Sequence, residues 1–401
     1  MSRAVAEETV RVAPPALLAE PEVARVLAAL PRARAVGGVV RDTLAGRPLA
    51  DLDLATPDAP EAVTAALSAA GIRVIPTGLG HGTVTALAGS RPIEITTLRR
   101  DIATDGRHAT VAYTDDWRED AARRDFTINA MSMERDGTVH DWFGGREDLA
   151  DGRVRFVGEP ARRLAEDHLR ALRFFRFQAR YGRAAPDAAT LAAIAAAVPL
   201  LGRLSAQRVW SELKRILAAP DPSPSVALMA ETGVLAGVLP EATDQAALAG
   251  LVRAGAPADP LLRLAALAPG PAGALAERLR LSGAEAARLE AARGPVPPPD
   301  ADDHALRRAL AEAPPGALVD RAWLAEARGA PGGWAGLRAR LASMPVPSFP
   351  LTGADVVALG VPPGPRVGAA LAAVRAWWLA GGCVAGREAC LARLAEALGR
   401  G

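Results

Sequence analysis

Between Ala33 and about Arg155, short stretches of alternating apolar and polar residues are separated by glycine-containing turns. Alternation with a period of two is typical of half-buried strands. The stretches are ARAVGGVV, DLDLAT, IRVIPTG, TVTALAG, PIEITTLR and TVHDWFGG. A helical pattern, PEAVTAALSAAG, lies between the second and the third of them, and its Pro60 suits the first turn of a helix. This region is therefore predicted to form a mixed α/β domain.

Helical patterns dominate on both sides of this region. Residues 16–30 (ALLAEPEVARVLAAL) predict one helix, and from Pro160 onward the pattern is almost wholly helical. Proline-rich stretches interrupt it at 218–225, 293–303 and 343–353. Because proline lacks the backbone N–H that a helix needs, we interpret these stretches as joints between helical blocks.

Composition limits the classes of protein to consider. The chain has 401 residues, and at roughly 150 residues per domain this suggests two or three domains. Half of the residues are hydrophobic, which is ample for substantial cores. The net charge is only +2, so no overall field attracts nucleic acid, and any such binding depends on local clusters of charge.

Cysteine usage and the absence of apolar segments bear on the compartment. Cys383 and Cys390 have neither metal-ligand spacing nor a disulfide framework, as expected of free thiols in a reducing cytosol. No stretch has the roughly 18 consecutive apolar residues of a membrane helix. The N-terminal MSRAVAEETVRVAPP lacks a signal-peptide core. We expect a soluble, cytoplasmic protein with no membrane partner, whose oligomeric state stays open.

Two aspartates carry the first candidate chemistry. In a strand, residues i and i+2 point to the same face, so Asp51 and Asp53 are expected side by side. Adjacent carboxylates repel each other unless a cation holds them ionised, and Mg²⁺ prefers such oxygen ligands. Two metal ions roughly 4 Å apart can activate an attacking hydroxyl and stabilise a leaving pyrophosphate.

A glycine pair precedes these aspartates. Gly37 and Gly38 would let the backbone approach a phosphate closely, and Arg41 would help to neutralise a triphosphate. An isolated Asp-x-Asp pair is a solvated strand edge about as often as it is a metal site. The sequence Gly-Gly-x-x-Arg-Asp ten residues earlier favours the metal and phosphate interpretation.

Five motifs follow one another along the first 220 residues. They are GGVVRDTLAGRPLADLDLAT, RRDFTINAM, DWFGGREDL, EDHLRALRFFRFQARYG and LSAQRVWSELKRIL. In this order they resemble the signatures of the class II tRNA nucleotidyltransferases, the CCA-adding enzymes, which share a family with bacterial poly(A) polymerases. The third motif departs from the family pattern, because Trp142 stands where proline is expected. The resemblance covers about residues 30–220, with a weaker one over 351–378.

The resemblance implies an α+β fold. A polymerase β-like nucleotidyltransferase head with a mixed sheet and helices would be followed by an all-α neck, body and tail. The implied division is an N-terminal helix (1–30), a catalytic head (31–155), a neck with a nucleobase-reading helix (156–220), and a helical body and tail that bind tRNA (221–401). The implied activity is template-independent addition of CCA to the 3′ end of tRNA from CTP and ATP, with Mg²⁺ as cofactor and release of pyrophosphate. The implied contacts with tRNA are at its acceptor end and TΨC arm.

Asp167 and Arg170 in the fourth motif suggest how bases are selected. On one helix, residues three apart have neighbouring side chains. A carboxylate only accepts hydrogen bonds and a guanidinium only donates them. Cytosine and adenine offer an amino donor beside a ring-nitrogen acceptor, whereas uracil and guanine present the reverse order. The pair would therefore accept C and A and reject U and G. The structural alternative is a local salt bridge.

The resemblance assigns further nucleotide contacts. Arg173 and Arg176 continue along the same helix and resemble phosphate or base-supporting contacts. In the second motif, Asp125 resembles the residue that contacts the ribose hydroxyls, and Arg124 resembles a triphosphate contact. We interpret Asn129 as structural.

Two features near this site have more than one interpretation. Glu94 alternates with Ile93 and Ile95, and it is either a third metal-side carboxylate or an exposed strand residue. The polar stretch between Arg99 and Arg118 is interpreted as a mobile loop that lets one pocket change size between C and A.

Three functions remain as alternatives. The first is CCA addition. The second is poly(A) polymerase, or a partial enzyme that adds only C or only A. The third is an RNA-binding protein with an inactive core, against which the intact aspartates and Arg170 argue. Poly(A) relatives usually carry an arginine- and phenylalanine-rich strand where this chain has GLGHGTVTALA (78–88), which resembles the CCA-adding type.

Overall fold

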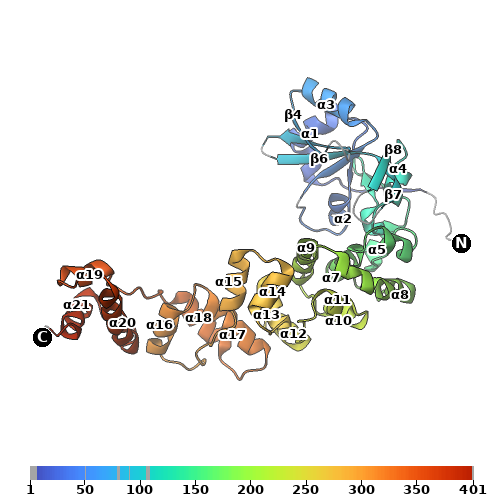
Figure 1. Ribbon diagram of the computed structural model, residues 1–401. Coiled ribbons are helices and arrows are strands. Elements are labelled where there is room, and N and C mark those ends of the chain that lie inside the picture. The colour runs from blue at the N-terminus through green and yellow to red at the C-terminus, as the bar shows by residue number, and fades with distance from the viewer. Residues whose placement is uncertain (1–6, 50, 79–81, 90, 105–108, 400–401) are drawn as a thin grey trace. The chain divides into compact units, whose positions relative to one another are not determined.

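The structure is a computed structural model that describes residues 7–49, 51–78, 82–89, 91–104 and 109–399. The chain forms two compact units, residues 1–239 and 240–401. The four-part division at residues 30, 155 and 220 stays a prediction. The predicted α+β class is confirmed, because a mixed sheet with helices occupies the first part of the chain and helices the rest (Figure 1).

A mixed sheet forms the first half of unit one, in the strand order β1-β10-β9-β2-β3-β6-β5-β4. Only β3 and β6 pair in parallel, and the other neighbouring strands pair antiparallel. The strands are β1 (Glu8–Arg11), β2 (Arg34–Val36), β3 (Asp53–Thr56), β4 (Arg73–Gly78), β5 (Thr83–Ala88), β6 (Arg91–Thr97), β9 (Ser132–Met133) and β10 (Thr138–Asp141). The predicted alternation places Leu54, Ile93 and Ile95 in the core.

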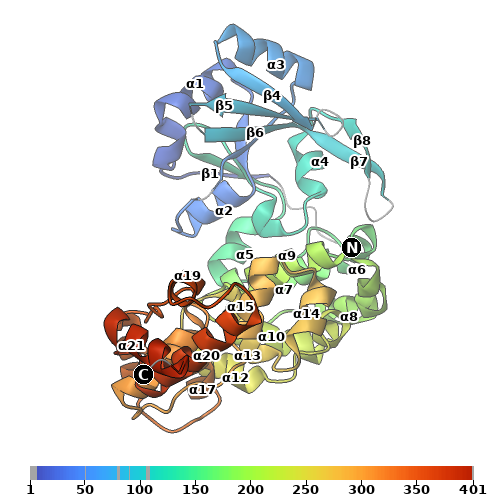
Figure 2. The ribbon, with the colours of Figure 1, turned by 60° about the vertical axis from the view of Figure 1, so that its left-hand side comes forward.

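The N-terminal segment differs from its prediction. In place of one helix over 16–30 there is a short 3₁₀ helix, η1 (Ala16–Ala19), followed by α1 (Pro21–Ala29). Pro21 stands at the first turn of α1, where its missing N–H costs nothing, and so marks a new helix start. Upstream, β1 was not predicted at all. The predicted helix that starts at Pro60 is confirmed as α3 (Pro60–Ala69), and Figure 2 shows α1 and α3 on one side of the sheet.

Within residues 99–118, interpreted as a mobile loop, the structure has two strands and the start of a helix, and a change of pocket size there stays a prediction. Strands β7 (Arg99–Thr104) and β8 (Ala109–Tyr113) form a separate antiparallel pair, and α4 (Trp117–Ala122) follows. Alternation of ATVAY is enough for a strand once a partner strand lies beside it. Residues 105–108 between the two strands lie outside the described residues, as do 79–81 of the GLGHGTVTALA stretch.

Helices complete unit one. They are α2 (Gly38–Leu44), α5 (Gly145–Asp151), α6 (Pro160–Glu166), α7 (Arg170–Tyr181), α8 (Ala188–Ala197), α9 (Ala206–Leu217), α10 (Ser223–Glu231) and α11 (Val234–Val238), with the 3₁₀ helices η3 (Thr127–Asn129) and η4 (Val198–Arg203). The helices α7 and α9 lie side by side (Figures 1 and 2).

An aromatic cluster joins α7 to the segment that carries the second motif. The ring of Phe126 lies 4.8 Å from that of Phe156 and 5.2 Å from that of Phe177, centroid to centroid. Phe174 stacks on Phe156 at 6.0 Å. Phe126, Phe156 and Phe174 are fully buried. Burial of such rings contributes roughly 2 kcal/mol each or more, so the cluster holds α7 firmly beside Asp125.

Unit two is helical throughout its described residues. Its helices are α12 (Gln245–Arg253), α13 (Pro260–Leu267), α14 (Ala272–Leu279), α15 (Gly283–Ala291), α16 (Asp303–Glu312), α17 (Ala317–Ala327), α18 (Trp334–Ser343), α19 (Gly353–Ala358), α20 (Pro365–Ala380) and α21 (Arg387–Ala397). The proline-rich stretches fall between α9 and α10, α15 and α16, and α18 and α19, as predicted. No described helix is long and apolar enough to cross a membrane.

Candidate active site

A cleft of about 680 Å³ opens in unit one between the sheet and the helices α7 and α9. Every residue that the sequence singles out as catalytic or nucleotide-binding lines it. These are Gly38, Arg41, Asp51, Asp53, Arg124, Asp125, Asp167, Arg170, Arg173 and Arg176. Gly37, which the sequence pairs with Gly38, also lines the cleft. Further lining residues that the sequence did not single out for the site are Arg123, Asn129, Leu169, Phe177, Arg208 and Arg215.

The glycine pair keeps one wall of the cleft open. Gly37 has a φ of 68°, a left-handed backbone conformation that favours glycine. A Cβ added there would lie 3.3 Å from Nη1 of Arg124, and one added at Gly38 would lie 3.6 Å from Nη2 of Arg41. Side chains at either position would therefore fill the space beside the two guanidinium groups.

Arg41 is held from several directions. Its Nη1 donates to Oδ1 of Asn129 at 2.6 Å, and its Nε and Nη2 donate to the carboxylate of Asp42 at 3.1 and 2.9 Å. The guanidinium also lies over the rings of Phe177 and Tyr181, at 5.2 and 4.6 Å from their centroids. Such a guanidinium is preorganised and loses little freedom when it binds an anion.

Asp51 and Asp53 lie at the same part of the cleft but not on one strand. Asp53 is the first residue of β3, whereas Asp51 precedes the strand, so the prediction that both alternate within a strand is wrong for Asp51. Asp53 pairs in register with Glu94 of β6. Register partners on neighbouring strands point to the same face, which brings the Glu94 carboxylate close to that of Asp53.

This crowding of acids changes the ionisation of Asp53. Partial desolvation in the cleft raises the pKa of Asp53, the charges of Glu94 and Asp51 raise it further, and Arg124 opposes the rise. Acids crowded around Asp53 in this way favour a bound cation, so the donor set fits a divalent ion. Within the described residues no three His, Cys, Asp or Glu side chains are close enough to form a metal-binding group. Asp51 and Asp53 therefore remain the candidate ligands, and Glu94 does not complete a set of three.

Asp125 is a buried carboxylate with three donors. Its Oδ1 accepts from the backbone N–H of Phe126 at 2.9 Å and from Nδ2 of Asn129 at 3.0 Å, and its Oδ2 accepts from Nε of Arg173 at 2.6 Å. Burial alone would raise the pKa of Asp125, but Arg173 and these hydrogen bonds lower it overall. Asp125 is therefore ionised at neutral pH, and Asn129 links it to Arg41.

The arginine pair of the second motif is anchored by an acid in α4. Asp120 is buried and accepts from Nε of Arg123 at 2.9 Å and from Nη2 of Arg124 at 3.2 Å. Although burial would raise the pKa of Asp120, the two guanidinium groups lower it overall. The anchored Arg124 keeps its other nitrogen, Nη1, beside Gly37.

Asp167 and Arg170 are brought to the cleft by a helix break. The prediction that they lie on one helix is wrong: α6 ends at Glu166, Asp167 is extended with φ of −156°, and α7 begins at Arg170. Asp167 accepts from the backbone N–H of Leu169 at 3.0 Å and from Nη2 of Arg208 at 2.7 Å. Arg170 donates from Nη1 to Oε2 of Glu166. Each member of the pair thus has its own partner.

A buried glutamate lies beneath the arginines of α7. Glu212 of α9 is 3% exposed, and its carboxylate lies 3.9 Å from Arg173, 3.3 Å from Arg176 and 3.4 Å from Arg215. Burial lowers the pKa of Arg176 to about 10, although Glu212 opposes the shift. Arg176 therefore stays charged at neutral pH, although its burial disfavours that charge.

Arg208 and Glu212 were not assigned from the sequence, although both lie in the fifth motif. Glu212 carried a usable signal. It stands three residues after Val209 and four before Ile216, on the apolar face of the helix, where an acid is buried only with partners. Arg208 gave no comparable signal, because its partner is 41 residues away in the chain.

Two protein-family models match parts of the chain. The poly A polymerase head domain matches residues 33–155, which hold the strands of the sheet other than β1 and the glycine, aspartate and second-motif residues of the cleft. The model described as a probable RNA and SrmB-binding site of polymerase A matches residues 185–245, which include α9.

A solved structure resembles nearly the whole chain. It is the crystal structure of the Bacillus stearothermophilus CCA-adding enzyme in complex with CTP, with a TM-score of 0.75 and 30% sequence identity. The similarity covers 94% of this chain and 98% of that one. The chain belongs to the CCA-adding enzyme family. The fold and the family predicted from the five motifs are thereby confirmed.

Two curated relatives align with half of the chain or less. The human mitochondrial CCA tRNA nucleotidyltransferase 1 is 48% identical over 190 residues, 46% of this chain and 43% of that protein. The Geobacillus stearothermophilus CCA-adding enzyme is 40% identical over 202 residues, 50% of this chain and 48% of that protein. The chain thus spans about half the length of these curated relatives.

Proposed function

We propose that this chain adds CCA to the 3′ end of tRNA, using CTP and ATP and releasing pyrophosphate. The observation that carries the proposal is the meeting of Asp51, Asp53, Asp167 and Arg170 in one cleft. Carboxylates suited to metal-assisted transfer thus lie within one nucleotide-sized space of a carboxylate and a guanidinium suited to base selection. The names of the relatives, CCA tRNA nucleotidyltransferase and CCA-adding enzyme, support the same activity.

Asp51 and Asp53 are the residues that would hold Mg²⁺. When bound, the metal supplies activation of the 3′-hydroxyl of the RNA and stabilisation of the leaving pyrophosphate. The arginines of the cleft neutralise the triphosphate, and Arg41 and Arg124 lie beside the open glycine wall where phosphates fit. Arg176 gains most from an arriving anion, because burial disfavours its charge in the free protein.

Asp125 is assigned to the ribose of the nucleotide. An ionised carboxylate has about four acceptor positions, and the backbone N–H of Phe126, Asn129 and Arg173 occupy three of them. Nη2 of Arg173 also contacts Oδ2, so a ribose hydroxyl would take the place of that contact. This assignment agrees with the resemblance of the second motif.

Base selection is assigned to Asp167 and Arg170. Each oxygen of Asp167 accepts one hydrogen bond, from Leu169 or from Arg208, and keeps a second lone pair for the amino group of cytosine or adenine. Arg170 uses Nη1 for Glu166, which leaves its other nitrogens to donate to the ring nitrogen of the base. Uracil and guanine would leave both groups unpaired in the cleft, a loss on the order of 1–3 kcal/mol per contact.

The partners follow from the activity. The helical unit two is assigned to tRNA, through the acceptor end and TΨC arm, by contacts with shape and phosphates. A cytoplasmic location stays a prediction, and a mitochondrial protein is among the relatives.

Poly(A) addition and single-nucleotide addition are the alternatives, since the head domain is also that of poly A polymerase. The test is extension of tRNA that ends at the discriminator base, with each nucleoside triphosphate alone and then with CTP and ATP together. We expect one or two C residues from CTP alone and CCA from the mixture. A long A tract from ATP alone would assign poly(A) polymerase, and no extension under any condition would assign an inactive RNA-binding protein.

A further inference from the structure

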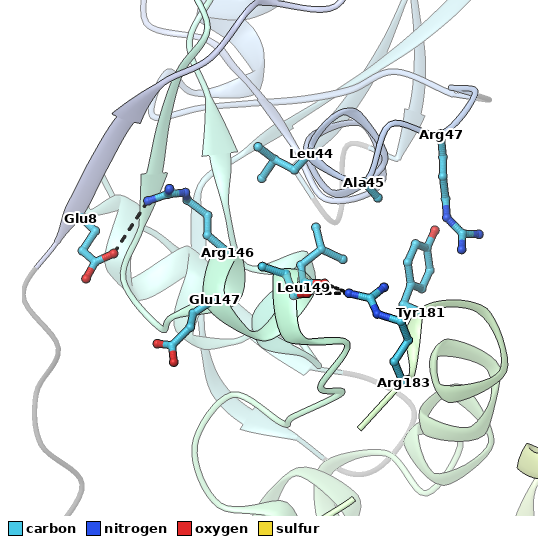
Figure 3. Close-up of a pocket in the computed structure, with 10 residues that line it drawn as sticks. Glu8, Leu44, Ala45, Arg47, Arg146, Glu147, Leu149, Tyr181 and Arg183 are labelled. Carbon is cyan, nitrogen blue, oxygen red and sulfur yellow. Dashed lines mark hydrogen bonds and ion pairs between the residues drawn. The ribbon is translucent and has the colours of Figure 1, made fainter. Parts of the chain in front are cut away.

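A second cavity, of about 690 Å³, lies in unit one (Figure 3). The cleft and this cavity share two helices. Arg41 of α2 and Phe177 of α7 line the cleft, while Ala45, directly after the end of α2, and Tyr181 of α7 line the second cavity. Residues four apart on a helix lie about one turn, roughly 6 Å, from each other on the same face. An RNA strand that occupies the cleft can therefore continue into this cavity.

Two guanidinium groups of this cavity donate to backbone oxygens. Arg47 donates from Nη2 to the backbone oxygen of Arg180 at 2.7 Å, and Arg183 donates to the backbone oxygen of Leu149 at 3.3 Å. Among the described residues neither has a carboxylate partner. A carbonyl oxygen fixes the direction of a guanidinium but leaves its net positive charge in place. The cavity thus holds two oriented, uncompensated charges.

Each acid that lines the cavity has an arginine partner. Glu8 is paired with Arg146, at 3.8 Å between the charged atoms, and Glu147 lies 2.9 Å from Nη2 of Arg153. Figure 3 shows the contact between Glu8 and Arg146 at one end of the cavity, while Arg47 and Arg183 occupy the other. The end near α7 is therefore the positive one.

Backbone hydrogen bonds hold Arg183 in position. Its N–H donates to the backbone oxygen of Gly152 at 2.8 Å, and the N–H of Ala184 donates to the same oxygen at 3.1 Å. Gly152 has a φ of 72°, and a Cβ added to it would come within 2.6 Å of the Arg183 Cβ. Close approach at this glycine thus brings the Arg183 side chain to the cavity.

The cavity has no platform for a base. The ring of Tyr181 is its aromatic surface, and the guanidinium groups of Arg41 and Arg47 already lie over it, at 4.6 and 4.7 Å from the centroid. The Tyr181 hydroxyl donates to Asp42. With the ring covered and the hydroxyl used, the remaining chemistry recognises a phosphate rather than a nucleobase.

We propose that Arg47 and Arg183 bind a backbone phosphate of the RNA strand whose 3′ end enters the cleft. This inference rests on the proposed function, since it takes tRNA as the strand. A phosphate contact carries no base information, so the site fixes the position of any tRNA and leaves base selection to Asp167 and Arg170. The same chemistry would also accept free pyrophosphate, and the experiment separates the two sources.

The experiment measures binding of tRNA lacking its 3′ CCA across a series of salt concentrations. Arg183→Gln, and Arg47→Gln with Arg183→Gln, remove the charges. Removal of one interaction with a phosphate should reduce the slope of log K against log[salt] by about 0.7–0.9. We expect the double variant to bind tRNA about 10-fold or more weakly near 0.1 M salt, with an unchanged KM for CTP at saturating tRNA.

Two further variants separate charge from folding. Arg183→Lys keeps the charge and should retain most of the affinity. Ala150→Glu adds a carboxylate at an exposed position on the cavity wall and leaves both arginines in place, and it should weaken tRNA binding. Arg11→Gln is the matched control, because it removes one exposed charge that has its own acid, Asp136, at 3.4 Å. It should bind tRNA like the unaltered protein.

The outcomes are distinct for the cavity and for the activity. If the double variant and Ala150→Glu bound tRNA with unchanged affinity and slope, the inference would be overturned, whether or not CCA is added. If they lost inhibition by pyrophosphate but kept tRNA binding, the cavity would be a free-anion site and the inference would also fail. If the unaltered protein bound tRNA through this cavity but added no nucleotide, the proposed activity alone would fail.

Discussion

Arg208 of α9 donates a hydrogen bond to Oδ2 of Asp167 at 2.7 Å, across 41 residues of sequence. The other oxygen of Asp167 accepts from the backbone N–H of Leu169, two residues further along. Both oxygens of the carboxylate are therefore held, and the orientation in which Asp167 meets a base depends on Arg208. This makes Arg208 a positioning residue for base selection.

Substitution of Arg208 should reduce selectivity. Loss of a hydrogen bond between charged groups costs about 1.5–3 kcal/mol, so we expect Arg208→Ala to lower the ratio of kcat/KM for CTP over UTP roughly 10-fold. Arg208→Lys should recover part of that ratio. The measurement is single-turnover addition of each nucleotide to tRNA lacking CCA. An equal loss for CTP and UTP would mean that Arg208 serves the fold and not the choice of base.

The sequence predicted residues that form this site but not the hydrogen bonds between them. The motif that contains Asp167 and Arg170 has helical periodicity throughout, with no glycine or proline to signal the break between α6 and α7. The break depends on the Asp167 side chain, which hydrogen-bonds to nearby backbone and competes with the helix. The partnership with Arg208 is tertiary, and no local pattern encodes it.

Strand β1 is a second feature that could not be predicted from the sequence. Its residues, Glu8–Arg11, are mostly charged or polar, and the strand pairs only with β10 at the end of the sheet. Charged edge strands protect a sheet from aggregation but lack the apolar alternation that predicts a strand. By contrast, the central strands were predictable because one face of each is buried.

The metal hypothesis predicts loss of chemistry without loss of binding. Asp51→Ala and Asp53→Ala should each abolish addition of both C and A, since all nucleotides use the same transfer step. The Kd for tRNA should change little, because residues that act on the transition state need not bind the substrate. Near-normal turnover by either variant would contradict the assignment.

Because the pKa of Asp53 is raised, the metal hypothesis can be tested through the stability of the protein as well as through its activity. A carboxylate whose pKa is raised by folding weakens the folded state as pH rises through that pKa. At neutral pH without divalent ions, Asp53→Asn should therefore be at least as stable as the unaltered protein. Added Mg²⁺ should raise the Tm of the unaltered protein and leave that of Asp53→Asn nearly unchanged. An equal shift for both would place the ion elsewhere.

Asp125 should stabilise the fold at neutral pH, whereas the raised pKa of Asp53 should weaken it. Burial would raise its pKa, but Arg173 and the hydrogen bonds to its oxygens lower it. A lowered carboxylate pKa contributes stability above the unfolded value of about 3.9, and this is lost as pH falls through the folded value. We expect Asp125→Asn to cost about 3 kcal/mol at pH 7 and the difference to shrink below about pH 4. Urea unfolding between pH 3 and 7 measures it, and a difference that grows toward acid would refute the pairing.

Glu212 should matter for both stability and nucleotide binding. It is the buried acid shared by Arg173, Arg176 and Arg215, so its loss leaves buried positive charge uncompensated. Glu212→Gln should destabilise the protein by about 3–5 kcal/mol and raise the KM for both CTP and ATP. The matched control is Arg215→Gln, whose side chain is 57% exposed. It should shift stability by less than about 1 kcal/mol, and equal losses in the two variants would contradict the shared-acid role.

The central claim is that two side chains, and no nucleic acid template, select the base. The most direct test is single-turnover addition of CTP and of UTP to tRNA lacking CCA by the unaltered protein and by Asp167→Ala. A hydrogen-bonding contact to a base is worth about 1–3 kcal/mol, so the CTP-over-UTP ratio of kcat/KM should fall roughly 10- to 100-fold. If Asp167→Ala instead lost rate equally for CTP and UTP, the residue would be serving the fold or the phosphates, and the account of base selection would be wrong.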